Sequence, residues 1–136
     1  MAHSMVEFRG KQELFGDTDL LLVLHFLVDA LHQRARDTAA ALAHDLSRPF
    51  NGCTPGCLIV PLDNLSRDAD RWCEFCPALL HAIEKLRSFG ERIPKQEIEM
   101  MWRADDGVTW LADIPTAPYV DAARRLARLC LCTLPH

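Results

Sequence analysis

The stretch that decides the fold is LLLVLHFLVDAL, residues 20–31, in which only His25 and Asp29 interrupt the apolar run. Leucines recur at the helical spacing of positions 20, 24, 27 and 31, and the apolar residues between them widen the same face. A helix that is apolar around most of its circumference is buried. We therefore expect residues 20–31 to lie in a central, largely buried helix.

This helix should begin and end at recognisable signals. Gly16-Asp17-Thr18-Asp19 places side-chain acceptors and acidic groups beside the free N–H groups of a helix start. The apolar stripe continues to Leu46, and Arg34–Asp37 is where it would break. Ser47-Arg48-Pro49 then ends it, because the residue before a proline avoids helical backbone angles. The prediction is one long N-terminal helix over about residues 20–46.

Two further helices are expected towards the C-terminus. Pro77 favours a helix start, and this helix should run to Phe89 with Gly90 as its C-terminal cap. Thr116 favours the start of a last helix over about residues 118–131. The segment LIVPL, residues 58–62, is short and apolar, and its proline restricts it to an edge strand.

Residues 95–114 allow two interpretations. Apolar residues alternate with other residues on both sides of ADDG, residues 104–107, which predicts a β-hairpin with an Asp-Gly turn. The alternative is a short helix over residues 94–104. We prefer the hairpin. The predicted fold class is therefore mainly α (α+β), with a long N-terminal helix and two further helices around a small β-hairpin, in one compact domain over residues 1–136.

The totals of the chain describe a folded protein without a strong charge bias. Of its 136 residues, 49% are hydrophobic and 25% are charged, and the formal net charge is -4. This composition is typical of globular domains and excludes wholesale disorder. The basic residues are spread along the chain, whereas a nucleic-acid groove needs clustered Lys and Arg. We therefore do not expect a nucleic-acid partner.

The N-terminal sequence and the apolar runs bear on location. MAHSMVEFR, residues 1–9, has no apolar core of signal-peptide length, and residues 20–31 fall short of the about 20 apolar residues that cross a bilayer. We expect a cytoplasmic protein, bacterial by its abundance of Ala, Arg, Leu and Asp, with no membrane partner. A reducing compartment argues against disulfides. Its cysteines should therefore bind metal, do redox chemistry or be buried.

Four cysteines form the most specific motif: Cys53 and Cys57 flank a Pro-Gly turn, and fifteen residues separate this pair from Cys73 and Cys76. Two such pairs separated by a spacer are typical of structural zinc sites, because each pair can point two sulfur atoms at one ion. The hypothesis is a zinc ion that braces the central loop against the second helix. The alternative is that the four cysteines are small buried apolar residues.

The second pair also suggests redox chemistry. Trp72-Cys73-Glu74-Phe75-Cys76 resembles the Trp-Cys-x-x-Cys active-site motif of thioredoxin-like oxidoreductases, and Ile114-Pro115-Thr116 resembles their cis-proline segment. The resemblance implies a thiol–disulfide oxidoreductase in which Cys73 attacks and Cys76 resolves. It also implies a strand before the motif and a helix after it. The predicted long N-terminal helix does not belong to that family, and neither does the predicted last helix, which stands where the family has a pair of strands.

A third group lies on the long helix, where His25, Asp29 and His32 are spaced by four and then three residues. One helix face could present all three to a metal, which would suggest a metal-dependent hydrolase. The alternative is the polar stripe of an amphipathic helix. The width of the apolar face leaves room for a buried His25.

Met100, Met101, Trp102 and Trp110 supply a large apolar surface on a small element, and such residues dominate protein-binding hot spots. No complete catalytic motif stands beside them. The preferred hypothesis is a small non-enzymatic protein-binding module of the bacterial inhibitor, immunity or adaptor type, which the four cysteines could brace with zinc. Its expected partner is another protein, such as a toxin or a regulated enzyme. The thiol–disulfide oxidoreductase and the hydrolase are the alternatives.

Overall fold

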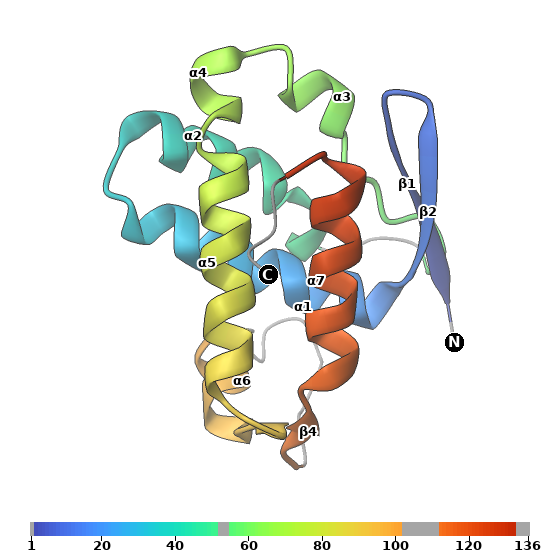
Figure 1. Ribbon diagram of the computed structural model, residues 1–136, viewed down its shortest axis with the longest axis vertical. Coiled ribbons are helices and arrows are strands. Elements are labelled where there is room, and N and C mark those ends of the chain that lie inside the picture. Colours follow the sequence, from blue (N-terminus) through green and yellow to red (C-terminus); the bar gives the residue numbers. More distant parts are fainter. Residues whose placement is uncertain (1, 52–54, 102–111, 133–136) are drawn as a thin grey trace.

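The computed structural model describes residues 2–51, 55–101 and 112–132, apart from the side chains of Asn51 and Met101 (Figure 1). It is 61% helical, which confirms the predicted mainly α class with a small β component. The helical elements are α1 (Asp17–Gln33), α2 (Asp37–Leu46), η1 (Arg48–Asn51), α3 (Leu62–Leu65), α4 (Ala69–Trp72), α5 (Phe75–Ser88), α6 (Lys95–Met101) and α7 (Ala117–Leu129). The strands are β1 (His3–Phe8), β2 (Lys11–Gly16), β3 (Arg92–Ile93) and β4 (Ile114–Pro115).

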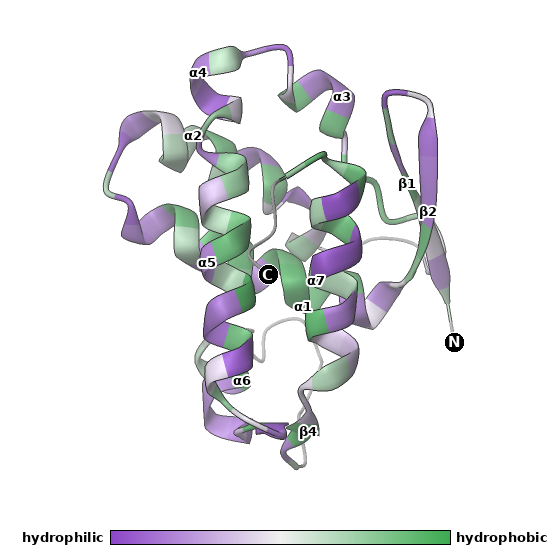
Figure 2. Ribbon diagram, viewed as in Figure 1, coloured by the Kyte–Doolittle hydropathy of each residue, from purple (hydrophilic) through white to green (hydrophobic). Residues whose placement is uncertain are grey.

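The apolar run 20–31 forms the buried centre of α1, as the sequence predicts. In Figure 1, α5 and α7 run antiparallel in front, and α1 passes behind both. Figure 2 shows hydrophobic residues along α1 and alternating hydrophobic and hydrophilic bands on α7. Because α5 and α7 are antiparallel, the start of α5 and the end of α7 lie at the same end of the pair.

The predicted long helix breaks at residues 34–36, where the sequence placed its weak point. Ala35 adopts a left-handed backbone with φ 52°, which is unfavourable for a residue other than glycine. Glu74, at the start of α5, accepts hydrogen bonds from Arg34 and Arg36, on either side of Ala35. Glu74 is only 2% exposed, and the hydrogen bond from Arg34 lowers the pKa of its carboxyl. A residue from a distant helix thus holds this turn.

A β-hairpin occurs at the N-terminus, ahead of α1. β1 pairs antiparallel with β2, and the connecting Arg9 and Gly10 both have positive φ, 51° and 81°. This is the backbone that two-residue hairpin turns require. The turn was missed because Arg-Gly is not one of the common Asn-Gly or Asp-Gly pairs. The inner face buries Val6, Phe8 and Phe15.

The hairpin predicted over residues 95–114 is wrong in its first strand, because residues 95–101 form helix α6 as in the alternative interpretation. Pro94 begins the helix, and its carbonyl oxygen accepts from the N–H groups of Glu97 and Ile98. Asp113 accepts a hydrogen bond of 2.9 Å from the Lys95 N–H, which caps α6 from far along the chain. The expected turn, residues 104–107, and the residues up to 111 lie outside the described residues.

Candidate functional site

A groove of about 520 Å³ opens where α2, η1, α3, α4 and the segment 57–61 meet. Its walls combine apolar residues with polar side chains from α2, η1, α3 and α4. The lining residues are Asp45, Arg48, Pro49, Cys57, Ile59, Pro61, Asn64, Leu65 and Arg71. They include two arginines and one carboxylate, so the lining carries a net positive charge.

The segment 57–61 forms one wall, and the hairpin holds it in place. The buried Ser4 hydroxyl accepts a hydrogen bond of 3.0 Å from the Leu58 N–H and donates to Asp17. Asp17 in turn accepts from the Gly56 N–H at 2.8 Å. Ser4 lies in β1 and Asp17 is the first residue of α1. These contacts therefore tie the wall to the core.

Side chains of this segment alternate between inside and outside. Leu58 and Val60 are 2% and 7% exposed, whereas Ile59 between them is 73% exposed. The alternation is that of an extended segment. The edge strand predicted over residues 58–62 is wrong, because the segment joins neither of the sheets in the described part of the chain and Leu62 already begins α3. Within that part, the Ile59 N–H and C=O groups make no hydrogen bond.

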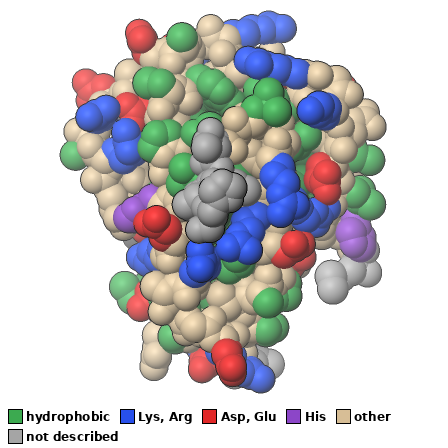
Figure 3. Space-filling model, viewed as in Figure 1, with side chains coloured by type: hydrophobic (Ala, Val, Ile, Leu, Met, Phe, Trp, Pro, Cys, Tyr) green, Lys and Arg blue, Asp and Glu red, His purple; other side chains and the backbone are tan. Residues whose placement is uncertain are grey.

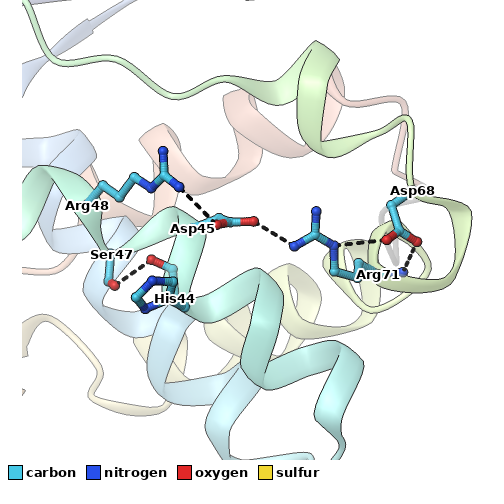
Figure 4. Close-up of polar contacts among 6 residues, drawn as sticks. All are labelled: His44, Asp45, Ser47, Arg48, Asp68 and Arg71. Carbon is cyan, nitrogen blue, oxygen red and sulfur yellow. Dashed lines mark hydrogen bonds and ion pairs between the residues drawn. The ribbon is translucent and has the colours of Figure 1, made fainter.

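The polar floor is a chain of ion pairs, shown in Figure 4. Asp45 lies between two arginines, with Oδ2 2.8 Å from Arg71 Nη1 and Oδ1 3.6 Å from Arg48 Nη2. Arg71 also donates from Nε to Asp68 at 3.1 Å, and the Asp68 carboxylate caps α4. The Arg71 side chain is therefore fixed from two sides.

Arg48 differs from Arg71 because its side chain is 75% exposed and its pair with Asp45 is long. An exposed ion pair of this kind contributes about 0–1 kcal/mol. Arg48 can therefore turn towards a ligand at little cost. The groove offers an apolar wall, unpaired backbone groups and one readily available positive charge. These are features of a surface that binds peptide segments.

The four cysteines expected to bind zinc are not brought together in the described residues. Cys57 and Cys73 are exposed thiols, Cys76 is bonded to Cys132, and Cys53 lies outside the described residues. No group of three or more described His, Cys, Asp or Glu side chains could hold a metal ion. Cys53 is one of the four proposed ligands, so the described residues do not test the zinc hypothesis. The zinc content of the purified protein stays a prediction that elemental analysis checks.

The expectation that no disulfide forms is wrong for Cys76, whose sulfur is bonded to that of Cys132 across 56 positions of sequence. The two meet because α5 and α7 run antiparallel, so that the start of one lies beside the end of the other (Figure 1). The sequence spacing instead suggested Cys73, three positions before Cys76, as its functional partner. The remaining Cys130 is buried, and burial raises the pKa of its thiol to about 12.

The thioredoxin-like resemblance does not extend to the fold. Helix α4 precedes Cys73 where that family has a strand, and the described residues contain no cis peptide bond, Pro115 included. Trp72 packs between two aromatic rings, with ring centroids 5.6 Å from Phe8 and 4.5 Å from Phe75. Trp72 therefore packs the hairpin against α5. Redox chemistry at Cys73 and Cys76 stays an untested prediction.

The three residues suggested for a hydrolase do not converge either. His25 is buried and its ring stacks on Phe50, with centroids 3.7 Å apart. Asp29 accepts from Gln33 and lies 3.7 Å from the Lys85 ammonium, while His32 is exposed. The apolar face of α1 is wide enough to take His25 into the core and leave the other two outside.

Acid is expected to destabilise the protein through His25. Burial lowers the pKa of its imidazole from 6.5 to about 4. Between pH 6.5 and about pH 4 the imidazole is protonated in the unfolded chain but stays neutral in the folded protein. The free energy of unfolding therefore falls as the pH falls. From about pH 7 to pH 5 the loss should be up to about 2 kcal/mol. Urea unfolding at both pH values measures it.

His25→Leu should remove this part of the pH dependence. His44→Gln, at an exposed histidine of α2, should keep it. If His25→Leu and the wild type lose the same stability between the two pH values, the buried imidazole is not the cause.

The residues proposed from sequence to bind a partner are only partly described. Met100 lies on α6 and is 76% exposed. The side chain of Met101 and the residues Trp102 and Trp110 lie outside the described residues. The groove was not found from the sequence, because its lining is spread over residues 45–71 and only the fold gathers it. The apolar segment LIVPL with its proline was the one available signal.

Comparison with known proteins adds no assignment, since no protein-family model, no curated protein and no solved structure matches the chain. No helix among the described residues is long and apolar enough to cross a membrane. The function therefore has to be argued from the groove itself.

Proposed function

We propose that this protein is a small protein-binding module of the inhibitor, immunity or adaptor type, and that its groove holds a segment of the partner. The observation that carries the proposal is Ile59, whose side chain is 73% exposed at the rim of the groove. An exposed isoleucine on an anchored wall can contribute to binding without a large ordering cost. Ser4 and Asp17 supply that anchoring.

The backbone of the same wall supports this mode of binding. The N–H and C=O groups of Ile59 make no hydrogen bond within the described residues, and its neighbours point into the core. An extended segment with free backbone groups can pair with an added strand of a partner. Main-chain hydrogen bonds would then supply affinity, and the apolar groove would select the partner's side chains.

Charge supports a partner segment with an acidic residue. Arg71 is held by Asp45 and Asp68, whereas Arg48 is exposed and only weakly paired. A partner carboxylate beside Arg48 would gain an ion pair without breaking a strong one. The apolar contact should therefore supply most of the affinity and Arg48 the orientation.

Photo-crosslinking in the native cell tests the proposal. A photoreactive amino acid at position 59 should give one dominant adduct with another protein, and a second variant with Arg48→Glu should give much less. The matched control carries the same amino acid at Met100, a similarly exposed apolar residue on α6. Adducts from position 100 alone would move the binding surface to α6. The absence of any specific adduct from either position would contradict a protein-binding function.

A further inference from the structure

A second pocket, also of about 520 Å³, lies where the end of α5 meets the start of α7. It is separate from the groove, and nothing in the proposed function uses it. Arg87 comes from the last turn of α5, and Thr116, Ala117 and Arg124 come from the start of α7 and its next turns. Figure 3 shows basic side chains over α7 and between α7 and α5, with acidic ones beside them.

Thr116 departs from its expected role as a helix cap. Its backbone is already helical, with φ −75° and ψ −36°, and its side chain makes no capping hydrogen bond. The residue is 4% exposed, and its hydroxyl Oγ1 is buried with no hydrogen-bond partner in the described structure. Leaving a buried hydroxyl unpaired is unfavourable, and such groups are rare. Thr116 also lines the pocket, so a ligand held there could supply a partner for this hydroxyl.

The backbone around Thr116 fixes this geometry. Its N–H donates to the Glu91 carbonyl oxygen at 3.0 Å, and its own carbonyl oxygen accepts from Tyr119 and Val120, each at 3.1 Å. The Ala117 N–H has no such partner among the described residues, and Pro118 has no N–H to offer. A free N–H at the start of a 13-residue helix lies at the positive end of its dipole.

The charges of the pocket suit an anion that is held by directed donors. Neither Arg87 nor Arg124 forms an ion pair with a described residue, so both guanidinium groups are available. Glu91 and Asp121 also line the pocket and balance the two arginines. Net charge alone would therefore not attract an anion. Planar guanidinium groups bind phosphate oxygens in pairs, which adds geometry to charge.

We propose that this pocket binds a phosphate group, either as inorganic phosphate or as a phosphate monoester. The Thr116 hydroxyl and the Ala117 N–H donate to one side of the phosphate, and Arg87 and Arg124 bind the oxygens on the other. Glu91 and Asp121 limit the site to ligands that make these hydrogen bonds, which disfavours simple anions such as chloride.

The test is a titration of the isotope-labelled full chain with inorganic phosphate and, separately, with phosphoserine, followed by NMR against chloride of equal ionic strength. Saturable shifts of the Thr116 and Ala117 amides are expected with phosphate and not with chloride. A tighter response to phosphoserine would identify a monoester as the ligand, and a tighter response to phosphate would identify the free ion. Shifts that are absent, or equal in chloride, would overturn the proposal.

Three variants separate a built site from general charge. Thr116→Val and Arg124→Gln should each raise the dissociation constant for phosphate by about tenfold or more. Arg128→Gln, one turn further along α7 and outside this pocket, should change it by less than about twofold. An equal loss with Arg128→Gln would overturn the proposal.

Stability gives a second measure that does not depend on affinity. Without phosphate, Thr116→Val should have the wild-type Tm or a higher one, because it removes an unpaired buried hydroxyl. It should also lose the rise in Tm that phosphate gives the wild type. A clear fall in Tm without phosphate would show that the hydroxyl serves the fold and would contradict a ligand-binding role.

Discussion

Replacing Phe75 by alanine is expected to lower the free energy of unfolding by about 3–5 kcal/mol. Phe75 is fully buried at the start of α5, and its ring stacks on Trp72 with centroids 4.5 Å apart. Trp72 in turn packs on Phe8 of the hairpin. The ring therefore belongs to an aromatic stack that joins the neighbouring helices α4 and α5 to the distant strand β1, and alanine would leave a cavity in this stack. Urea unfolding measures the loss.

Phe75→Leu should cost less, because leucine fills much of the space. Met100→Ala, at a side chain that is 76% exposed, should change the stability by less than about 0.5 kcal/mol. A loss below about 1 kcal/mol for Phe75→Ala would show that the ring is not the buried junction described here.

Replacing Cys132 by serine should lower the free energy of unfolding by about 2–4 kcal/mol. Its bond to Cys76 closes a loop across 56 positions and so restricts the unfolded chain. It also fastens the residues that follow α7 to the first turn of α5. Unfolding in urea, with and without a reducing agent, measures the contribution.

Wild-type protein with reductant should match Cys132→Ser, while Cys73→Ser, at an exposed thiol, should stay near the wild type without reductant. Peptide mapping should recover Cys76 and Cys132 in one crosslinked product. If reductant leaves the stability unchanged and no such product is found, the two cysteines are not bonded in solution.

The helices could be predicted because their signals are local. The apolar run 20–31 and the stop at Pro49 are read from adjacent residues, and the sequence also located the break near Arg34. The contacts that stabilise that break could not be read in the same way. Glu74 accepts from Arg34 across 40 positions, and no local pattern announces such a partner. Asp113, which caps α6, is a similar case.

The error at residues 95–101 has a physical cause. Apolar residues at 98, 100 and 102 fit the period of a strand, but Ile98 alone is described as buried while Met100 is exposed. The proline at 94 and the Lys95–Glu99 ion pair, 3.5 Å long, favour the helix instead. Alternation over so few residues is a weaker signal than a helix start with a partner for its first N–H groups.

The candidate site was less predictable than the fold. Spacing drew attention to the four cysteines, yet among the described residues Cys57 and Cys73 belong to no group of three metal ligands, and Cys76 is bonded to Cys132. The groove depends on side chains from five short elements, and no single stretch contains them. Ile59 is notable only once its neighbours are known to be buried.

Ile59 and its groove are proposed to bind a partner protein. The most direct test is the affinity of the crosslinked partner, once purified, for the wild type, Ile59→Asp and Met100→Asp. Ile59→Asp should weaken binding by about tenfold or more, since a hot-spot side chain contributes at least about 1.4 kcal/mol, and Met100→Asp should bind like the wild type. Wild-type affinity in Ile59→Asp, with a loss in Met100→Asp, would contradict binding at Ile59.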